Sequence, residues 1–125
     1  MKIKSDTKEK FHVVTVLEPV LAANMTEQLE EILLSYLDGP VRSVILNFEN
    51  VNEIDDVAAA RLAQVQQRFY EDKCSLVFCN LKPEVEDFLD KNELLEVMNV
   101  TPTESEAWDI VQMEEIEREL YGDDN

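Results

Sequence analysis

Three consecutive stretches stand at the centre of this sequence: VILNF at residues 44–48, ENVNEIDD at residues 49–56 and VAAARL at residues 57–62. The first is almost entirely apolar and β-prone, which is typical of a strand that is covered on both faces. The second is polar and ends in two adjacent acids, Asp55 and Asp56. The third begins a helical spacing of apolar residues. A central strand therefore passes into a helix through an acidic turn, at the end of an open α/β sheet where sites tend to be built.

The two acids have a structural interpretation as well. A carboxylate at the start of a helix accepts free backbone N–H groups and interacts favourably with the helix dipole. We therefore expect Asp55 or Asp56 to be the N-cap of the helix that follows. The inward face of that helix is predicted to consist of Ala58, Leu62, Val65 and Phe69.

The net charge of the chain narrows the classes of binding partner that we expect. The chain has 125 residues, the size of one domain, and its 28 Asp and Glu against 11 Lys and Arg give a net charge of −17. Nucleic acids and anionic membranes bind basic patches, so neither is expected as a partner. An acidic surface favours a basic protein partner, or serves only solubility. No apolar run approaches the length of a membrane span and no signal core opens the chain, so we expect no membrane insertion and a cytoplasmic protein.

The two cysteines predict no disulfide and no metal. Cys74 and Cys79 flank an apolar stretch that is expected to be a strand. Residues five apart on a strand point to opposite faces, which makes a bond between these two implausible. No Cys-x-x-Cys pattern and no nearby histidine indicate a zinc or redox site. We interpret both as buried, reduced thiols, as is usual in a cytosolic protein.

Before the central stretch, two strands and a helix are expected. Residues 1–5 and 11–17 predict strands joined by a charged turn, and we expect them to form an antiparallel pair. Asn24 followed by Glu27 resembles a capping box and predicts a helix that begins there. Gly and Pro at residues 39–40 predict its end.

After the central helix, the pattern of alternation continues. Pro83 is suited to the first position of a short helix. Residues 94–98 form a short apolar run that we interpret as a last edge strand. Thr103 and Glu106 form a capping box that opens a terminal helix. Trp108, near the start of that helix, is interpreted as an anchor that packs against the body of the domain.

The predicted fold class is α/β: a small mixed β-sheet in which an initial antiparallel pair is followed by parallel β-α units, packed with about four helices. We assign residues 1–112 to a single domain. Residues 113–125 are expected to be the acidic end of the terminal helix and a frayed tail.

Residues for catalysis are scarce. The only glycines are Gly39 and Gly122, so no phosphate loop or dinucleotide fingerprint can form. A nucleophilic site of the Ser/His/Asp or Cys/His kind would need His12, which we interpret as a surface or structural histidine. No cofactor is expected.

Several short segments are shared with a known family. They are AAN at residues 22–24, VILNFENV at residues 44–51, IDDVA at residues 54–58 with Leu62, and VEDFL at residues 85–89 followed by two leucines. Together with the order of elements, these segments resemble the STAS domain, the module of sulfate transporters and anti-sigma factor antagonists. The resemblance covers about residues 10–112 and implies a STAS-like fold.

The resemblance also implies roles for the acidic turn. In that family a loop serine after an aspartate is phosphorylated by an anti-sigma factor kinase, which switches binding off until a phosphatase restores it. By position, Asp55 matches the family aspartate, Asp56 stands on the phosphorylated serine, Val57 on the second hydroxyl residue and Ala58 on the glycine. A second register, with Asp56 on the aspartate, puts Val57 on the serine and loses the match at Leu62, so we prefer the first. No hydroxyl group remains in the loop in either register.

From the resemblance and the scarcity of catalytic residues we expect a non-enzymatic, protein-binding regulatory module that holds no metal and lacks a serine phospho-switch. Its partner-binding loop would comprise Asp55, Asp56, Val57 and Ala58. The resemblance implies a protein partner such as an anti-sigma factor or a serine kinase. Two alternatives remain: a small metal-dependent phosphatase-type enzyme that uses Asp55 and Asp56 with Glu53, and an acidic assembly subunit that docks through its C-terminal helix.

Overall fold

The computed structural model describes the backbone of residues 1–122 and the side chains of residues 1–120. In chain order the elements are β1 (Ile3–Thr7), β2 (Phe11–Val16), β3 (Val20–Leu21), α1 (Ala23–Tyr36), β4 (Ser43–Asn47), β5 (Glu53–Ile54), α2 (Asp56–Glu71), β6 (Leu76–Cys79), α3 (Pro83–Lys91), η1 (Leu95–Val97), β7 (Val100–Thr101), α4 (Glu104–Glu117) and η2 (Arg118–Gly122).

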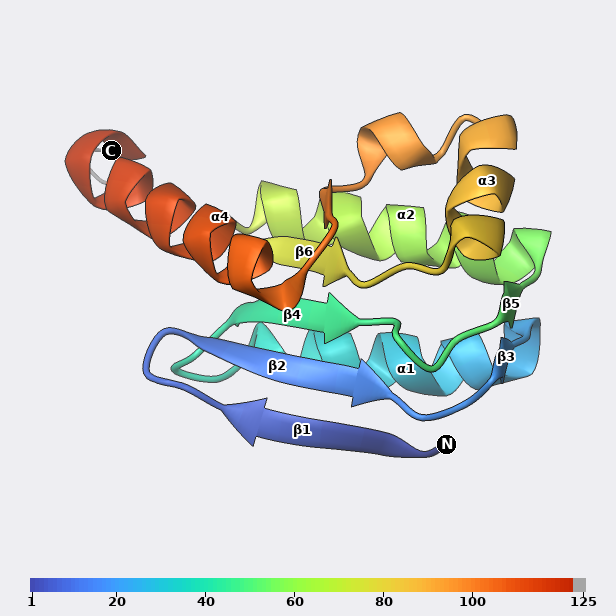
Figure 1. The fold of residues 1–125 in the computed structure, drawn as a ribbon. Coiled ribbons are helices and arrows are strands. Elements are labelled where there is room, and N and C mark those ends of the chain that lie inside the picture. Colours follow the sequence, from blue (N-terminus) through green and yellow to red (C-terminus); the bar gives the residue numbers. More distant parts are fainter. Residues whose placement is uncertain (123–125) are drawn as a thin grey trace.

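The main sheet has five strands in the order β1-β2-β4-β6-β7 (Figure 1). β1 and β2 are antiparallel, with Ile3 opposite Val16, and every later pair in this sheet is parallel. The predicted fold class, a mixed sheet that opens with an antiparallel pair, is confirmed. β3 and β5 form a separate two-stranded parallel sheet.

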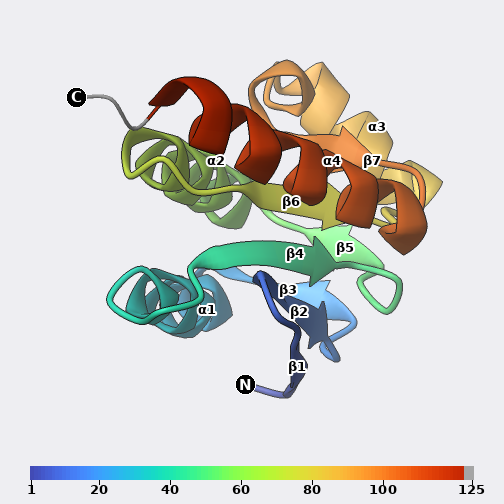
Figure 2. The same cartoon turned by 90° about the vertical axis from the view of Figure 1, so that its left-hand side faces the viewer.

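Helices cover both faces of the main sheet. Figure 2 shows α1 and α2 on one side of the strands and α4 on the other. Alternate residues of β4 and β6 divide between the two layers, as the two-residue period of a strand requires. Leu46 and Phe78 pack in the larger core with α1, α2 and α3, whereas Ile45 and Val77 pack in the smaller core under α4. Both central strands are buried throughout, as predicted from the apolar run at residues 44–48.

The predicted inward face of α2 is confirmed. Ala58, Leu62, Val65 and Phe69 are buried, together with Ala59. Helical periodicity was sufficient here because one face of the helix packs on the sheet along its length.

The predicted edge strand at residues 94–98 is wrong. Leu95–Val97 is a short 3-10 helix, and the last strand is β7, which pairs with β6 only at Phe78 and Cys79. Leu94 and Leu95 still pack against the larger core, from a turn instead of a strand. A short apolar run has no periodicity that separates these two ways of burying it.

The predicted capping box at the start of α1 is wrong as well. The N-cap is Ala22, which has no side-chain oxygen, and the helix begins at Ala23. The N–H of Ala23 donates to the carboxylate of Asp55, 32 residues further along the chain, at 3.1 Å. A long-range acceptor therefore replaces the local one that Asn24 and Glu27 were expected to provide.

The terminal helix begins as predicted. The backbone N–H of Glu106 donates to Thr103 Oγ1 at 3.2 Å. Trp108 packs edge-on against Phe11, with ring centroids 5.1 Å apart, so it is an anchor as expected. α4 continues past residue 112 to Glu117, and residues 123–125 of the predicted frayed tail lie outside the described residues. The boundary of the domain at residue 112 stays a prediction.

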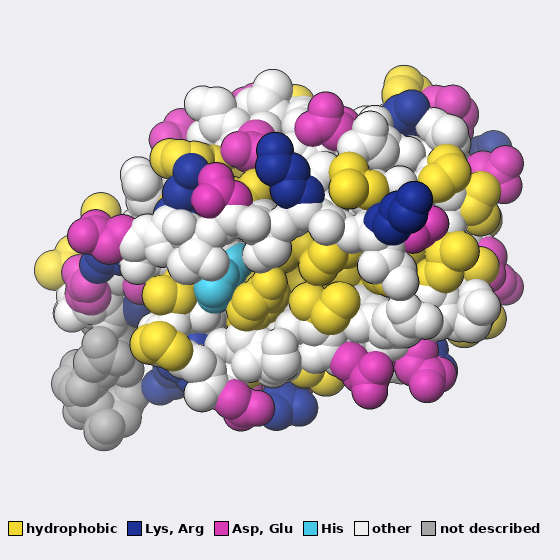
Figure 3. Space-filling view, turned by 90° about the horizontal axis from the view of Figure 1, so that it is seen from below, with side chains coloured by type: hydrophobic (Ala, Val, Ile, Leu, Met, Phe, Trp, Pro, Cys, Tyr) yellow, Lys and Arg dark blue, Asp and Glu magenta, His cyan; other side chains and the backbone are white. Residues whose placement is uncertain are grey.

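His12 has a structural role, as expected. Its Nδ1 lies 2.9 Å from Thr7 Oγ1 and its Nε2 lies 2.8 Å from the carbonyl oxygen of Val41. The ring stacks on Tyr36 with centroids 4.0 Å apart. Only a small part of it reaches the surface (Figure 3). Both ring nitrogens are engaged, which ties β2 to β1 and to the chain after α1.

Among the described residues, none of the helices combines the length and the apolar character needed to cross a membrane.

Candidate partner-binding loop

The acidic turn is anchored to a second connection by the small β3–β5 sheet. Val20 pairs with Glu53 and Leu21 pairs with Ile54. The backbone N–H of Asp55 donates to the carbonyl oxygen of Leu21 at 3.2 Å. The loop before α2 and the loop before α1 therefore form one platform beyond the carboxyl ends of β2 and β4, the end of the sheet at which a site was expected.

Asp55 is the N-cap of α2, and its carboxylate also binds the N-terminus of α1. Its Oδ1 accepts the N–H of Ala58 at 2.7 Å, the capping bond within α2. Its Oδ2 accepts the N–H of Ala23 at 3.1 Å, at the first residue of α1. One carboxylate thus satisfies a free N–H at two helix N-termini, where the dipoles also favour a negative charge. The prediction that one of the two acids caps a helix is confirmed for Asp55, whose role is to hold the platform together.

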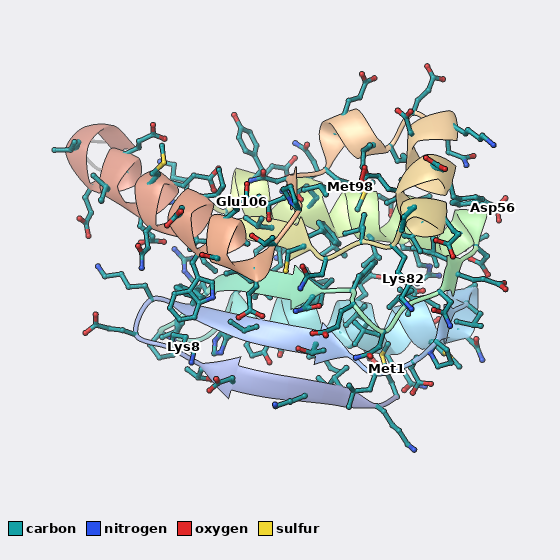
Figure 4. All side chains as sticks on the ribbon, in the orientation of Figure 1. Met1, Lys8, Asp56, Lys82, Met98 and Glu106 are labelled. Atoms are coloured by element: carbon teal, nitrogen blue, oxygen red, sulfur yellow. The ribbon has the colours of Figure 1, made fainter. Side chains whose placement is uncertain are left out.

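Asp56 is exposed at the first position of α2, at the right-hand end of the molecule in Figure 4. Its Oδ1 accepts only the adjacent N–H of Val57, at 3.0 Å, among the described residues. Its charge therefore faces solvent on the first turn of α2.

The other two predicted loop residues differ from each other. Val57 is 47% exposed, which is high for a β-branched apolar residue, whereas Ala58 is fully buried against the core. Asp55 is exposed as well, but both of its carboxylate oxygens accept backbone N–H groups. Asp56 and Val57 are therefore the exposed residues of the loop that do not fix its shape.

Sequence reasoning missed the apolar side chains that accompany Val57. Val20 in β3 is 43% exposed, and Leu17 just before it is exposed to the same extent. The exposed Glu53 pairs with Val20 across the small sheet. We call Leu17, Val20, Glu53, Asp56 and Val57 the loop surface. The pairing of β3 with β5 brings its two halves together, and a two-residue strand has no sequence pattern that predicts it.

The arrangement gives little support to the phosphatase-type alternative. Both oxygens of Asp55 are occupied by backbone N–H groups. Within the part of the chain that the structure describes, no three His, Cys, Asp or Glu side chains converge in a way that could hold a metal ion. Asp56 and Glu53 alone fall short of the ligand number that Mg²⁺ or Ca²⁺ requires from a protein site.

The cysteines are buried and not bonded to each other, as expected. Burial raises the pKa of the Cys79 thiol to about 12, with further contributions from the carboxylates of Glu104 and Glu49. Burial also raises the pKa of Cys74, against the opposing effect of two arginines. Neither thiol is set up to act as a nucleophile, because nucleophilic cysteines have a lowered pKa and access to solvent.

Comparison with known proteins places this geometry among related structures. The model of the STAS domain family matches residues 2–107. No curated protein sequence matches the chain.

Similar solved structures come from two kinds of protein. An anti-sigma-factor antagonist (STAS) domain protein from Planctomyces limnophilus superposes with a TM-score of 0.72 at 21% identity, over 84% of this chain and 93% of that one. A serine-to-glutamate variant of RsbS from Moorella thermoacetica has a TM-score of 0.73 at 16% identity, over 90% and 97%. The murine anion transporter Slc26a9 has a TM-score of 0.70 at 18% identity, over 82% of this chain and 18% of the transporter. At such identities the likeness shows a shared fold.

Proposed function

This chain belongs to the STAS domain family, and on that premise we propose that it is a non-enzymatic regulatory module that binds a protein partner through the loop surface. The observation that carries the proposal is the pairing of an exposed apolar residue, Val57, with an exposed carboxylate, Asp56, on the rigid first turn of α2. The similarity to anti-sigma factor antagonists supports a regulatory partner, such as an anti-sigma factor or a serine kinase.

The composition of the loop surface suits a protein partner. Protein interfaces combine an apolar centre with a polar rim. Val57 and Val20 would supply the centre, and Asp56 and Glu53 the rim. The platform is already fixed by the double cap of Asp55, so binding costs little ordering of the loop. A surface of this charge favours a partner with basic residues at the matching positions.

The loop would work without a phospho-switch. In the preferred register Asp56 stands where related antagonists carry the phosphorylated serine. A phosphoserine brings about −1.5 to −2 charge at a helix N-terminus, whereas a carboxylate brings about −1 and no kinase or phosphatase changes it. The protein would therefore stay in a permanently acidic state, and its partner would be one that accepts this charge.

Affinity purification with matched baits tests the proposal. We expect wild-type protein to retain a specific partner from native extract at low salt, and the variant Val57→Asp to lose it. Gln67→Ala, on the exposed face of α2 two turns and more from the loop, is the control bait and should retain the partner. The retained protein is then purified and its dissociation constant measured with each bait. If Val57→Asp and wild type bind it with the same affinity, the loop surface is not the binding site.

A further inference from the structure

A groove lies at the end of the molecule opposite the loop surface. It is bounded by the C-terminal half of α2, by η1 and by the second half of α4, and has a volume of about 900 Å³. Its position follows from the shortness of β7, which pairs with only the last two residues of β6 and so leaves the space beside the beginning of that strand to side chains.

Large apolar side chains stand exposed on the walls of the groove. Tyr70 of α2 is 74% exposed and Val97 of η1 is 57% exposed, and both line the groove above Met98. Outward from the groove, α4 exposes Met113 and Ile116, and Leu120 follows within η2. Their i, i+3, i+7 spacing places these three on one stripe along the helical end of the chain.

The second half of α4 is oriented unusually, with polar groups inward and apolar groups outward. Glu114 accepts the hydroxyl of Ser75 at 2.5 Å, and the guanidinium of Arg118 donates to the same hydroxyl at 2.8 Å. Arg118 also pairs with Glu115 at 3.1 Å. Polar bonds therefore hold this end of the helix against the residue that precedes β6, which leaves the apolar stripe without a partner among the described residues.

The charged residues around the groove indicate which sign of charge a bound partner would carry. Glu71, Glu96 and Glu117 line it and are exposed, and none of them forms an ion pair within the described part of the chain. Lys73 is the exposed cation among the lining residues. With a net charge of −17 on each molecule, a second copy of this chain would be repelled. A cationic partner would be attracted.

We propose that this groove and the neighbouring stripe of α4 bind an amphipathic helix of a partner protein, apolar on one face and flanked by Lys and Arg. A helix inserts apolar side chains into a groove through i, i+3, i+4 and i+7 anchors, which suits an open groove between two helices. Its flanking cations would lie against the glutamates of the rim, with Tyr70 as an additional face for a cation.

The groove is separate from the loop surface. Asp56 begins α2 and Glu71 ends it, so the 16 residues of the helix separate the two surfaces by about 24 Å at 1.5 Å per residue. In Figure 4, Asp56 and the end of α4 lie at opposite sides of the molecule. Two partners could bind at once, and the module would then connect them.

A synthetic peptide of about 18 residues, with Leu at helical i, i+3, i+4, i+7 spacing and Lys elsewhere, is the probe, and a scrambled peptide of the same composition is its control. We expect the patterned peptide to bind wild-type protein at least about tenfold more tightly than the scrambled one at about 0.15 M salt. Amide NMR shifts should concentrate in residues 66–76, 95–99 and 113–118.

Substitutions of exposed residues in the groove test whether the peptide binds there. Tyr70→Ser and Val97→Ser remove exposed side chains, so the fold should persist while the preference for the patterned peptide falls by about tenfold. Val57→Asp, in the loop surface, should leave the preference unchanged, which separates this proposal from the one above. Equal binding of the two peptides, equal binding by Tyr70→Ser and wild type, or shifts confined to residues 53–58 would overturn it.

Discussion

The Asp55 carboxylate and the Ala23 backbone N–H are joined at 3.1 Å across 32 residues of sequence, while the second oxygen of the same carboxylate caps α2 at Ala58. The role of Asp55 in this structure is architectural, because it fixes the two helix N-termini that frame the loop surface. The adjacent acid, Asp56, is exposed and accepts only the N–H of Val57 among the described residues.

Removing the Asp55 carboxylate should destabilise the protein markedly. Loss of an N-cap costs about 0.5–2 kcal/mol, and the N–H of Ala23 loses its acceptor at a further cost of about 0.5–1.5 kcal/mol. We therefore expect Asp55→Ala to lower the free energy of unfolding by about 1–3 kcal/mol in urea titrations. Asp56→Ala, the matched control at an exposed position, should change it by less than about 0.5 kcal/mol. Equal losses would mean that Asp56 is the cap.

The central helix gives a second test of packing. Leu62 is fully buried in the larger core, and Leu62→Ala should cost about 2–5 kcal/mol. The adjacent Arg61 is partly exposed and reaches Glu30 of α1 at 3.2 Å. Exposed ion pairs contribute about 0–1 kcal/mol, so Arg61→Ala should stay within that range. Thermal unfolding of the two variants checks this, and similar melting temperatures would contradict the observed orientation of α2.

These elements show which parts of the fold could be predicted from the sequence. The strand at residues 44–48 was predicted because the stretch is almost entirely apolar and β-prone and leads into a polar turn. The face of α2 that contains Leu62 was predicted because its helical period is repeated along the helix. The start of α1 was not, since its acceptor comes from Asp55, far away in sequence. The segment at residues 94–98 was assigned to a strand because a short apolar run is buried equally well by a 3-10 turn.

The candidate site was predictable in part for the same reasons. The positions of Asp55 and Asp56 were evident from the change of periodicity at the end of the strand, but which acid caps and which is exposed depended on geometry. Val20 was missed because it joins the site only through the pairing of β3 with β5.

Stability should fall at alkaline pH because of Cys79. Burial raises its pKa in the folded protein to about 12 from an ordinary value of 9.0. Between those values the unfolded chain loses the thiol proton first and binds fewer protons than the folded one, so the free energy of unfolding decreases as pH rises. The contribution of the Cys79 thiol to stability is fully present below pH 9. Between pH 9 and about pH 12 its decline approaches about 1.4 kcal/mol per pH unit.

The measurement compares wild type with Cys79→Ala by chemical denaturation at about pH 8 and about pH 10.5. Every other ionisable group is present in both proteins, so the difference between them isolates the Cys79 thiol. We expect wild type to lose about 1–2 kcal/mol more than the variant over this interval. Parallel losses would show that the Cys79 thiol does not carry the effect.

The loop should also be inert to phosphorylation. Residues 53–62 contain no Ser, Thr or Tyr. Incubation of the protein with ATP and a partner kinase should therefore leave every peptide from this span unmodified in mass spectrometry. The variant Asp56→Ser places a hydroxyl at the position that the resemblance assigns to the family phosphoserine, and it tests whether such a kinase recognises the loop. Phosphate found within residues 53–62 of wild type would contradict the assignment.

The dissociation constant of the partner retained by the wild-type bait, measured for wild type and for Asp56→Ser, tests the central claim most directly. Asp56 is not the N-cap, and its replacement should leave the unfolding transition within about 0.5 kcal/mol of wild type. If the exposed charge is recognised, its loss removes a charge-assisted contact, and Asp56→Ser should bind more weakly by at least about 1 kcal/mol, roughly fivefold. A variant that unfolds like wild type and also binds the partner with the wild-type constant would contradict the claim that this module binds through an acidic loop.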